Sequence, residues 1–262
     1  MKSVVEKVIK DFGDNGEVCV VFRSLNRDKK DDFSIMPDKV LPAASIIKLA
    51  ILASIMKMVD NKELSFSDQV SIKDGDMFGT FDAQHHFIKA SSYTVEDLCR
   101  LMIDLSDNLA SNMLIRVAGM DRINSDAKAN GLKHTVIARK FLDFETQKKG
   151  LENYTTPEET VMMIMHFVDK AKAGSRTAEM MLNILANQGD KNYLSQFMPP
   201  EICFAHKTGH IPGSMHDVGI ITLPSGAEYI ISVMTTSLKS DIEGLRFLNT
   251  LGEAVFTKIT TL

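Results

Sequence analysis

Residues 42–59 read PAASIIKLAILASIMKMV, a run in which apolar side chains cover nearly every face of a helix. A helix that is apolar all round is buried inside a protein, so the run predicts a core helix. Ser45 and Lys48 lie at its start, three positions apart. Side chains with this spacing share one side of a helix, so the amine of Lys48 is expected within reach of the hydroxyl of Ser45.

Strand-like segments lie on both sides of this helix in the sequence. Apolar and β-branched runs predict strands at residues 17–22, 202–206, 218–223 and 229–235. Amphipathic helices are expected over the first ten residues and about 241–259, and caps and glycine stops predict further helices in the middle of the chain, at Thr94, Thr156, Gly119 and Gly131. The order predicts a mixed α+β fold, with an α/β lobe from about 1–44 and 201–262 and an all-helical lobe from about 45–200. The lobe built from both ends is expected to be an antiparallel sheet flanked by the terminal helices.

Composition excludes several classes of protein. The chain has 262 residues, 44% of them hydrophobic, and a net charge of -4 without a basic stretch, so it predicts a globular protein that does not bind nucleic acid. The N-terminus lacks the apolar centre of a secretory signal, and no run reaches the roughly 20 apolar residues of a membrane span. Cys19, Cys99 and Cys203 are expected to be buried free thiols. These features favour a cytoplasmic monomer, unless an export signal has been trimmed from the chain.

Ser45 and Lys48 are candidates for a nucleophile and its base. A serine hydroxyl is a weak nucleophile until a base takes its proton, and a lysine among apolar neighbours has a lowered pKa. The helix start adds N–H groups that favour a developing oxyanion. The alternative is that Ser45 only caps the helix and Lys48 only lies on its surface. The tetrad Ser-x-x-Lys also occurs at Ser54/Lys57 and Ser125/Lys128, where it is expected to be ordinary helix surface.

Two further segments carry matching chemistry. Ser106-Asp107-Asn108 offers a second hydroxyl that could pass a proton to a leaving nitrogen, and an amide for a substrate carbonyl. The alternative is a plain cap between two helices. Lys207-Thr208-Gly209 ends a predicted strand, where a lysine and a threonine could pair with a substrate carboxylate and a glycine admits a close backbone approach. The N–H of the next residue, His210, could be a second oxyanion donor. The alternative is an edge-strand lysine that deters aggregation.

Together the three segments resemble the penicilloyl-serine transferases, the family of class A β-lactamases and penicillin-binding proteins. The resemblance covers essentially the whole chain, is closest to class A, and implies a β-lactamase/transpeptidase-like fold. It implies a nucleophile, a base or proton relay and a proton shuttle at Ser45, Lys48 and Ser106, and substrate binding by Asn108, Lys207, Thr208, Gly209 and His210. It implies a β-lactam or other acyl substrate and no cofactor.

The chain departs from that family at two positions. In class A enzymes, the second residue after the loop arginine is a glutamate that activates the deacylating water; here Arg139 is followed by Lys140 and Phe141. Asp143 and Glu145 are nearby acids that could substitute, although loop acids are usually only solvated. His216 falls on the strand where lactamases often carry an arginine for the substrate carboxylate.

Three functions therefore remain open: β-lactam hydrolysis, an esterase or D-Ala-D-Ala-type peptidase on the same fold, and a penicillin-binding sensor that stays acylated. A metal site at His206, His210 and His216 is not expected, because no Cys/His pair has zinc-finger spacing and no His-Glu-x-x-His motif occurs. His85-His86 is expected in a polar loop that borders the cleft.

Overall fold

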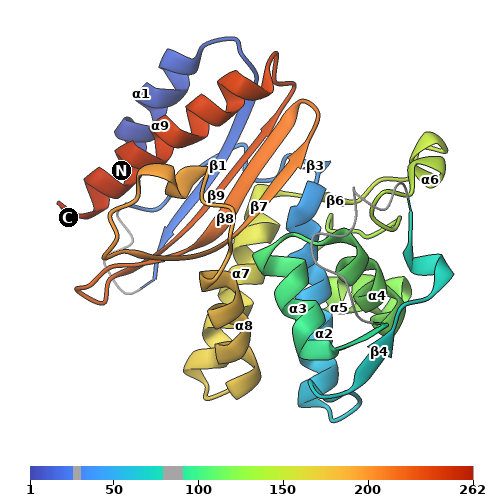
Figure 1. The fold of residues 1–262 in the computed structure, drawn as a ribbon. Coiled ribbons are helices and arrows are strands. Elements are labelled where there is room, and N and C mark those ends of the chain that lie inside the picture. Colours follow the sequence, from blue (N-terminus) through green and yellow to red (C-terminus); the bar gives the residue numbers. More distant parts are fainter. Residues whose placement is uncertain (26–30, 79–90, 262) are drawn as a thin grey trace.

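The computed structural model describes residues 1–25, 31–78 and 91–261. Its centre is a five-stranded antiparallel sheet of strand order β2-β1-β9-β8-β7 (Figure 1). The strands are β1 (Glu17–Ser24), β2 (Phe33–Ile35), β7 (Cys203–Ile211), β8 (Ser214–Thr222) and β9 (Glu228–Thr236). The sheet thus joins both ends of the chain, and the mixed α+β fold class predicted from the sequence is confirmed.

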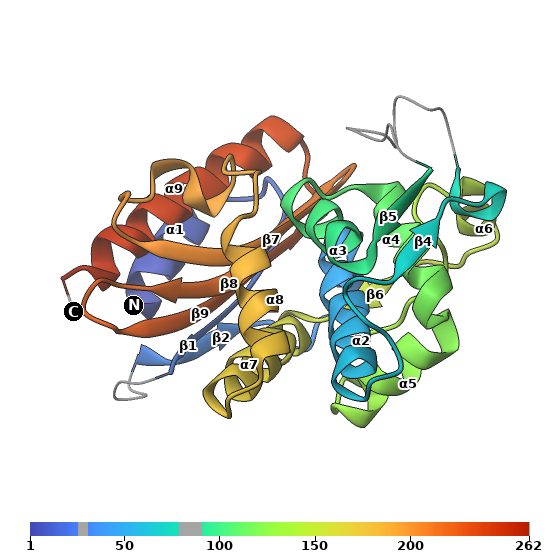
Figure 2. The ribbon, with the colours of Figure 1, turned by 60° about the horizontal axis from the view of Figure 1, so that its bottom comes forward.

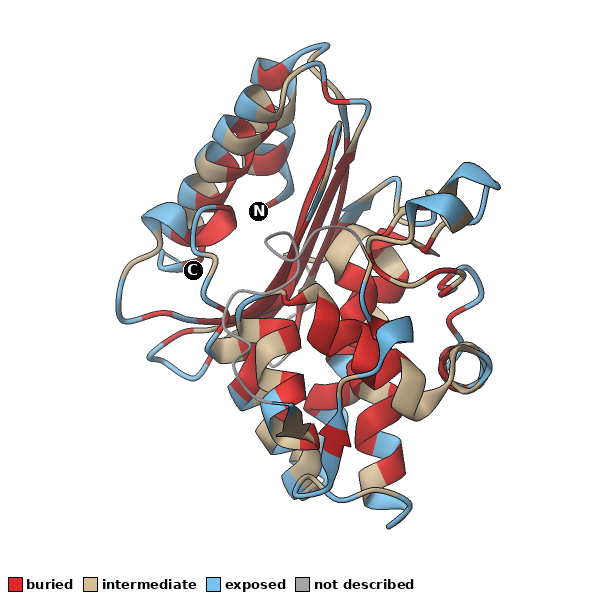
Figure 3. Ribbon diagram, turned by 45° about the vertical axis from the view of Figure 1, so that its right-hand side comes forward, coloured by how far each residue is buried: buried red, intermediate tan, exposed pale blue. Residues whose placement is uncertain are grey.

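Helices cover both faces of this sheet (Figure 2). One face packs against α1 (Lys2–Phe12) and α9 (Asp241–Ile259) around a core that includes Phe22, Tyr229 and Phe256. The other face packs against α7 (Pro157–Lys172) and α8 (Arg176–Ala186). Because helices cover both faces, the central strands β8 and β9 are buried along most of their length (Figure 3).

The buried helix predicted from residues 42–59 lies at the centre of the helical side (Figure 1). It begins as a 3₁₀ turn, η2 (Ala44–Ile47), and continues as α2 (Lys48–Asp60). Around it pack α3 (Val95–Asp104), α4 (Asn108–Ala118), α5 (Met120–Ala129), α7 and α8. Its apolar residues form the core of this side, so α2 is fixed on all sides by packing.

Local signals explain where the helices begin. Thr94 opens α3 with a capping box to Asp97, and the hydroxyl of Thr156 accepts the N–H of Glu159 at the start of α7. Asp107 caps α4, where its carboxylate accepts the N–H of Ala110 at 2.7 Å. These caps fix the ends of the segments that carry the candidate site.

The helical side also contains short strands that the sequence patterns did not predict. Two of them, β4 (Gln69–Ser71) and β5 (Ser92–Thr94), form a small sheet with each other. The other pair, β3 (Leu41–Pro42) and β6 (Tyr154–Thr155), joins the segment before η2 to the end of a long loop. Two further helical turns, η3 (Asp74–Asp76) and η5 (Leu194–Phe197), and the short helix α6 (Phe144–Lys148) complete the described elements. The region expected to be all-helical is therefore helical with small sheets, because pairs of only two or three residues leave no periodic signal.

One expectation about the cysteines was wrong. Cys19 and Cys99 are buried free thiols, but Cys203 is exposed. It stands at the first position of β7, just after the turn that follows Pro199-Pro200, where the side chain faces outward. Within the described residues, no helix is both long and apolar enough to cross a bilayer.

Candidate active site

Ser45 lies where the central helix begins beside the edge strand of the sheet. It lines a cleft of about 420 Å³ between η2, the C-terminal end of β7 and the loop of residues 139–153. Gly209 of β7 faces η2 so closely that a Cβ there would lie 3.3 Å from the backbone nitrogen of Ser45 and 3.1 Å from Cγ1 of Ile46. A side chain at Gly209 would displace the turn that carries Ser45, which explains the glycine.

Lys48 is fully buried beside this cleft, and its ammonium is held by three acceptors. Its Nζ donates to the carbonyl oxygen of Ser106 at 2.6 Å, the Oγ of Ser106 at 3.0 Å and the Oδ1 of Asn108 at 3.1 Å. Burial lowers the pKa of Lys48 well below its ordinary value; the charge of Lys207 lowers it further and that of Asp107 opposes the shift. Two of the three predicted segments therefore meet at one buried amine.

The three Ser-x-x-Lys tetrads have different environments. Only Ser45 and Lys48 belong to the cleft region. Ser54 is buried, contrary to expectation, and its hydroxyl donates to Asp126, which also accepts a hydrogen bond from Lys57. Ser125, like Lys128, is exposed on α5. Sequence spacing alone could not rank them, since all three share it.

The Ser106-Asp107-Asn108 segment is the turn between α3 and α4. Ser106 has φ +54°, a left-handed conformation that is rare outside glycine, and this turn directs its hydroxyl and carbonyl at Lys48. Ala44, the neighbour of Ser45, has φ +46°. Strained backbone in both the segment that carries Ser45 and the segment that binds Lys48 is typical of functional sites.

Lys207 completes the cluster from β7. Its side chain is fully buried and Nζ donates to the carbonyl of Thr208 at 2.9 Å. Burial lowers the pKa of Lys207 to about 8, while the charges of Asp190, Asp217 and Asp104 oppose the shift. His210, the next predicted binder after Gly209, lines the cleft with Ser45, and its ring contacts Asp241 of α9 at 2.9 Å.

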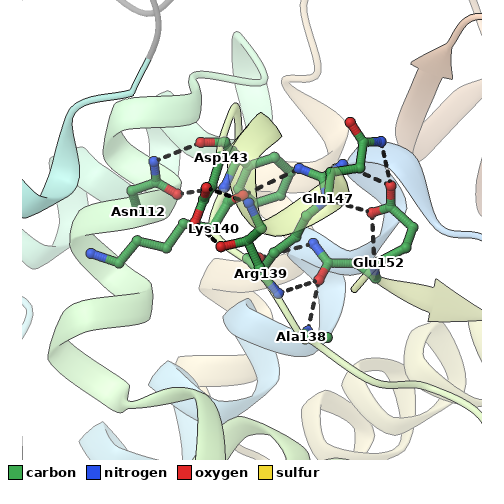
Figure 4. A network of polar contacts seen from close by, with 10 residues as sticks. Asn112, Ala138, Arg139, Lys140, Asp143, Gln147 and Glu152 are labelled. Carbon is green, nitrogen blue, oxygen red and sulfur yellow. Dashed lines mark hydrogen bonds and ion pairs between the residues drawn. The ribbon is translucent and has the colours of Figure 1, made fainter. Parts of the chain in front are cut away.

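The loop of residues 139–153 is closed by an ion pair at its neck (Figure 4). Arg139 donates Nε and one terminal nitrogen to the two carboxylate oxygens of Glu152, at 2.8 and 2.9 Å. Gln147 also donates to Glu152, whose pKa is lowered by these bonds against the effect of its burial. Asn153 links the loop to the site, because its carbonyl accepts the N–H of Ala43 just before η2.

Phe141 occupies the loop position that faces the buried amine. Its ring centroid lies 4.5 Å from Nζ of Lys48, and the side chain lines the cleft. Asn112 of α4 holds its backbone from both sides, with Oδ1 accepting the Phe141 N–H at 2.8 Å and Nδ2 donating to its carbonyl at 3.1 Å. A carboxylate at this position would therefore reach the amine and the cleft, but an aromatic ring occupies it instead.

The two candidate substitutes for a glutamate lie further along the loop. Asp143 caps α6, where its carboxylate accepts the N–H and the hydroxyl of Thr146 at 3.0 and 2.7 Å. Glu145 is highly exposed and pairs with Lys148. Neither belongs to the described residues that line the cleft, whose one carboxylate is the Arg139-bound Glu152.

The three histidines at which no metal site was expected have separate partners. His216 is buried on β8, in contact with the Pro42 carbonyl at 3.0 Å, and burial lowers its pKa to about 4, so it is neutral and offers a carboxylate no charge. His206 contacts Asp217 at 2.7 Å, both fully buried. Among the described residues no group of three His, Cys, Asp or Glu side chains could hold a metal ion. His85-His86 lies outside the described residues.

Sequence reasoning missed three residues that shape this site: Asn112, Glu152 and Asp190. Asn112 stands four positions after Asn108, so the helical period alone would have placed both on one face of α4. Glu152 and Asp190 gave no such signal, because their partners are distant in sequence or on another element.

Comparisons with known proteins identify the family and the fold. A family model described as the beta-lactamase enzyme family matches residues 1–259. Beta-lactamase VEB-1 of Pseudomonas aeruginosa is 25% identical over 255 residues, which cover 91% of this chain and 83% of that protein. A β-lactamase structure from Sphaerobacter thermophilus has a TM-score of 0.86 at 23% identity, covering 99% of this chain and 98% of its own. The structure of PBP-A has a TM-score of 0.86 at 24% identity, covering 100% of this chain and 97% of its own.

Proposed function

The chain belongs to the β-lactamase enzyme family, and we propose that it is a serine hydrolase that opens the amide of a β-lactam ring through an acyl-enzyme on Ser45. The observation that supports this most directly is the cluster around Lys48. The buried amine of Lys48 hydrogen-bonds to Ser106 and Asn108, and the charge of Lys207 lowers its pKa. Lys48 stands three residues after Ser45, about one helical turn along the chain. Segments distant in the sequence thus converge beside a single cleft.

Acylation begins with proton transfer from Ser45 to Lys48. Oγ of Ser45 then bonds to the lactam carbonyl carbon, and the carbon–nitrogen bond of the ring breaks. Ser106 lies 3.0 Å from the lysine amine, so it can pass the proton on to the leaving nitrogen. The N–H groups of Ser45 and His210, on either side of the cleft, are the proposed donors to the oxyanion.

Lys207 and Thr208 are proposed to bind the substrate carboxylate. Since the pKa of Lys207 is lowered to about 8, the ammonium is present below that pH and is lost as the pH rises through it. We therefore expect acylation by a carboxylate-bearing penicillin to fall above about pH 8, by about ten- to a hundredfold in total, the effect of losing one charged hydrogen bond. Stopped-flow acylation rates measured against pH test this.

Lys207→Arg is the matched control for that profile, because an arginine stays charged at every accessible pH. Its rate is expected to stay level where the parent rate falls. An ester substrate without a carboxylate should show no fall with either protein. If the penicillin and the ester decline together, Lys207 does not hold the carboxylate.

Deacylation is proposed to be the slow half of the reaction. Hydrolysis of the ester needs a base within hydrogen-bond reach of a water, and the ring of Phe141 occupies the position that faces Lys48. Of the described carboxylates, only Glu152 lines the cleft, and it is bound to Arg139 and Gln147. The lactam ring of the substrate is therefore opened in the first step, and the hydrolysed product is released slowly.

An intact-mass time course with benzylpenicillin tests the function. We expect the whole protein to gain the mass of one penicillin quickly and to lose it slowly, with the hydrolysed product in solution. An adduct that never decays indicates a penicillin-binding sensor, the second candidate, which the Phe141 position favours. Absence of an adduct, with ester turnover intact, indicates an esterase and contradicts the proposal.

A further inference from the structure

Phe141 has a contact that the loss of a deacylating carboxylate does not explain. Its ring lies over the ammonium of Lys48, with 4.5 Å between Nζ and the ring centroid. A cation at this distance from an aromatic face is attracted by the ring, more strongly when both are out of water. Lys48 is fully buried and Phe141 is 8% exposed, so the contact is largely desolvated.

The loop holds the ring in this place from both sides. Asn112 makes hydrogen bonds to both backbone groups of Phe141, and the next residue, Leu142, has φ +63°, a strained turn for a branched side chain. Lys140 on the other side bonds Asp76 of η3 at 3.5 Å. These contacts fix the backbone from which the ring projects.

We infer that Phe141 is a positioning residue for Lys48: its ring holds the amine by a cation–π contact in the place where a carboxylate would form an ion pair with it, so that Lys48 stays in position and can still lose its proton to act as the base of acylation. The inference rests on the proposed acyl-enzyme chemistry. It makes the aromatic side chain part of the acylating machinery, in addition to explaining slow deacylation.

The charges around Lys48 fit this role. Lys207 faces it from β7 and Asp107 from the start of α4, while Ser106, Asn108 and the Phe141 ring are uncharged. No carboxylate of the described residues hydrogen-bonds to Nζ, so burial and Lys207 lower the pKa of Lys48 and favour the neutral amine that accepts a proton. A carboxylate in place of the ring would hold the proton on the lysine. The ring also stabilises the ammonium, but less than a carboxylate would.

The pH dependence of acylation distinguishes this role from simple packing. Acylation needs neutral Lys48, so its rate falls as the pH drops below the pKa of that amine. This falling part of the pH–rate profile is its acid limb. Phe141→Leu removes the ring but keeps apolar bulk, and should move the acid limb down by about half a unit to one and a half units. Phe141→Glu should move it up by about one to three units, since an opposite charge favours the ammonium. Rates of adduct formation with benzylpenicillin, followed by quench and intact mass between about pH 5 and pH 10, give both limbs.

Phe197→Leu is the matched control, because Phe197 is an exposed phenylalanine on η5, which packs against α9 away from the cleft. Its acid limb should coincide with that of the parent. Opposite shifts in the leucine and glutamate variants support the inference. Limbs that stay at the parent value in both variants overturn it, while the adduct on the parent protein still stands. No adduct on the parent at any pH would instead contradict the proposed function. If the leucine variant does not fold, the upward shift in the glutamate variant decides alone.

Discussion

Ser45→Ala is expected to abolish the covalent adduct with penicillin and to lower hydrolysis of a chromogenic cephalosporin by at least about three orders of magnitude. The reason is that the hydroxyl is the atom that forms the bond, and the remaining groups only bind and polarise the substrate. The helix should survive, because Ser45 makes no side-chain cap and lies in a turn held by buried neighbours. Intact mass and cephalosporin turnover, measured on the folded variant, check the result.

Ser125→Ala is the control for that experiment. Ser125 opens another copy of the same tetrad, with Lys128 three positions later, but it is exposed on α5. This variant should form the adduct at the parent rate. Equal turnover by the parent and Ser45→Ala would show that the nucleophile lies elsewhere and would end the assignment.

Phe141→Glu is expected to accelerate decay of the acyl-enzyme by about a hundredfold to ten-thousandfold, the usual contribution of a general base. Asn112 fixes the backbone of residue 141, so the new carboxylate would project into the cleft beside Lys48, where the phenylalanine ring now lies. Its burial is compensated by the lysine ammonium, so the variant is expected to fold. The rate is measured by forming the adduct first, removing free penicillin and following the loss of mass at a pH where acylation is complete.

Phe141→Gln separates the chemistry from the change in size. Glutamine has nearly the same shape as glutamate and admits the same water, but it cannot take a proton. Its adduct should decay close to the parent rate. If the adducts of the glutamine and glutamate variants decay equally fast and faster than the parent adduct, then access of water, and not the missing base, limits deacylation in the parent. If neither is faster than the parent, residue 141 does not control deacylation.

The sequence was sufficient for the elements whose signals are local. The all-round apolar pattern after Pro42 predicted the buried helix, the capping box at Thr94 predicted the start of α3, and the final amphipathic run predicted α9. These signals depend on a residue and its neighbours within a turn or two, so they survive without knowledge of the fold. The three motif segments could be recognised for the same reason, since each is a short run of adjacent residues.

What the tertiary structure decided is which of these residues meet. Three tetrads share one spacing, yet only Lys48 of their lysines hydrogen-bonds to Ser106 and Asn108, and the ring of Phe141 from the loop lies over that amine. The two small sheets depend on pairing between segments distant in the sequence. The exposure of Cys203 depends on its place at the first position of β7, at the surface. Contacts between distant segments arise when helices and strands close around a common core, and a one-dimensional pattern of polar and apolar residues does not record them. The residue types therefore specified the available chemistry, and the packing of η2 against β7 and of α2 against α4 decided which side chains carry it.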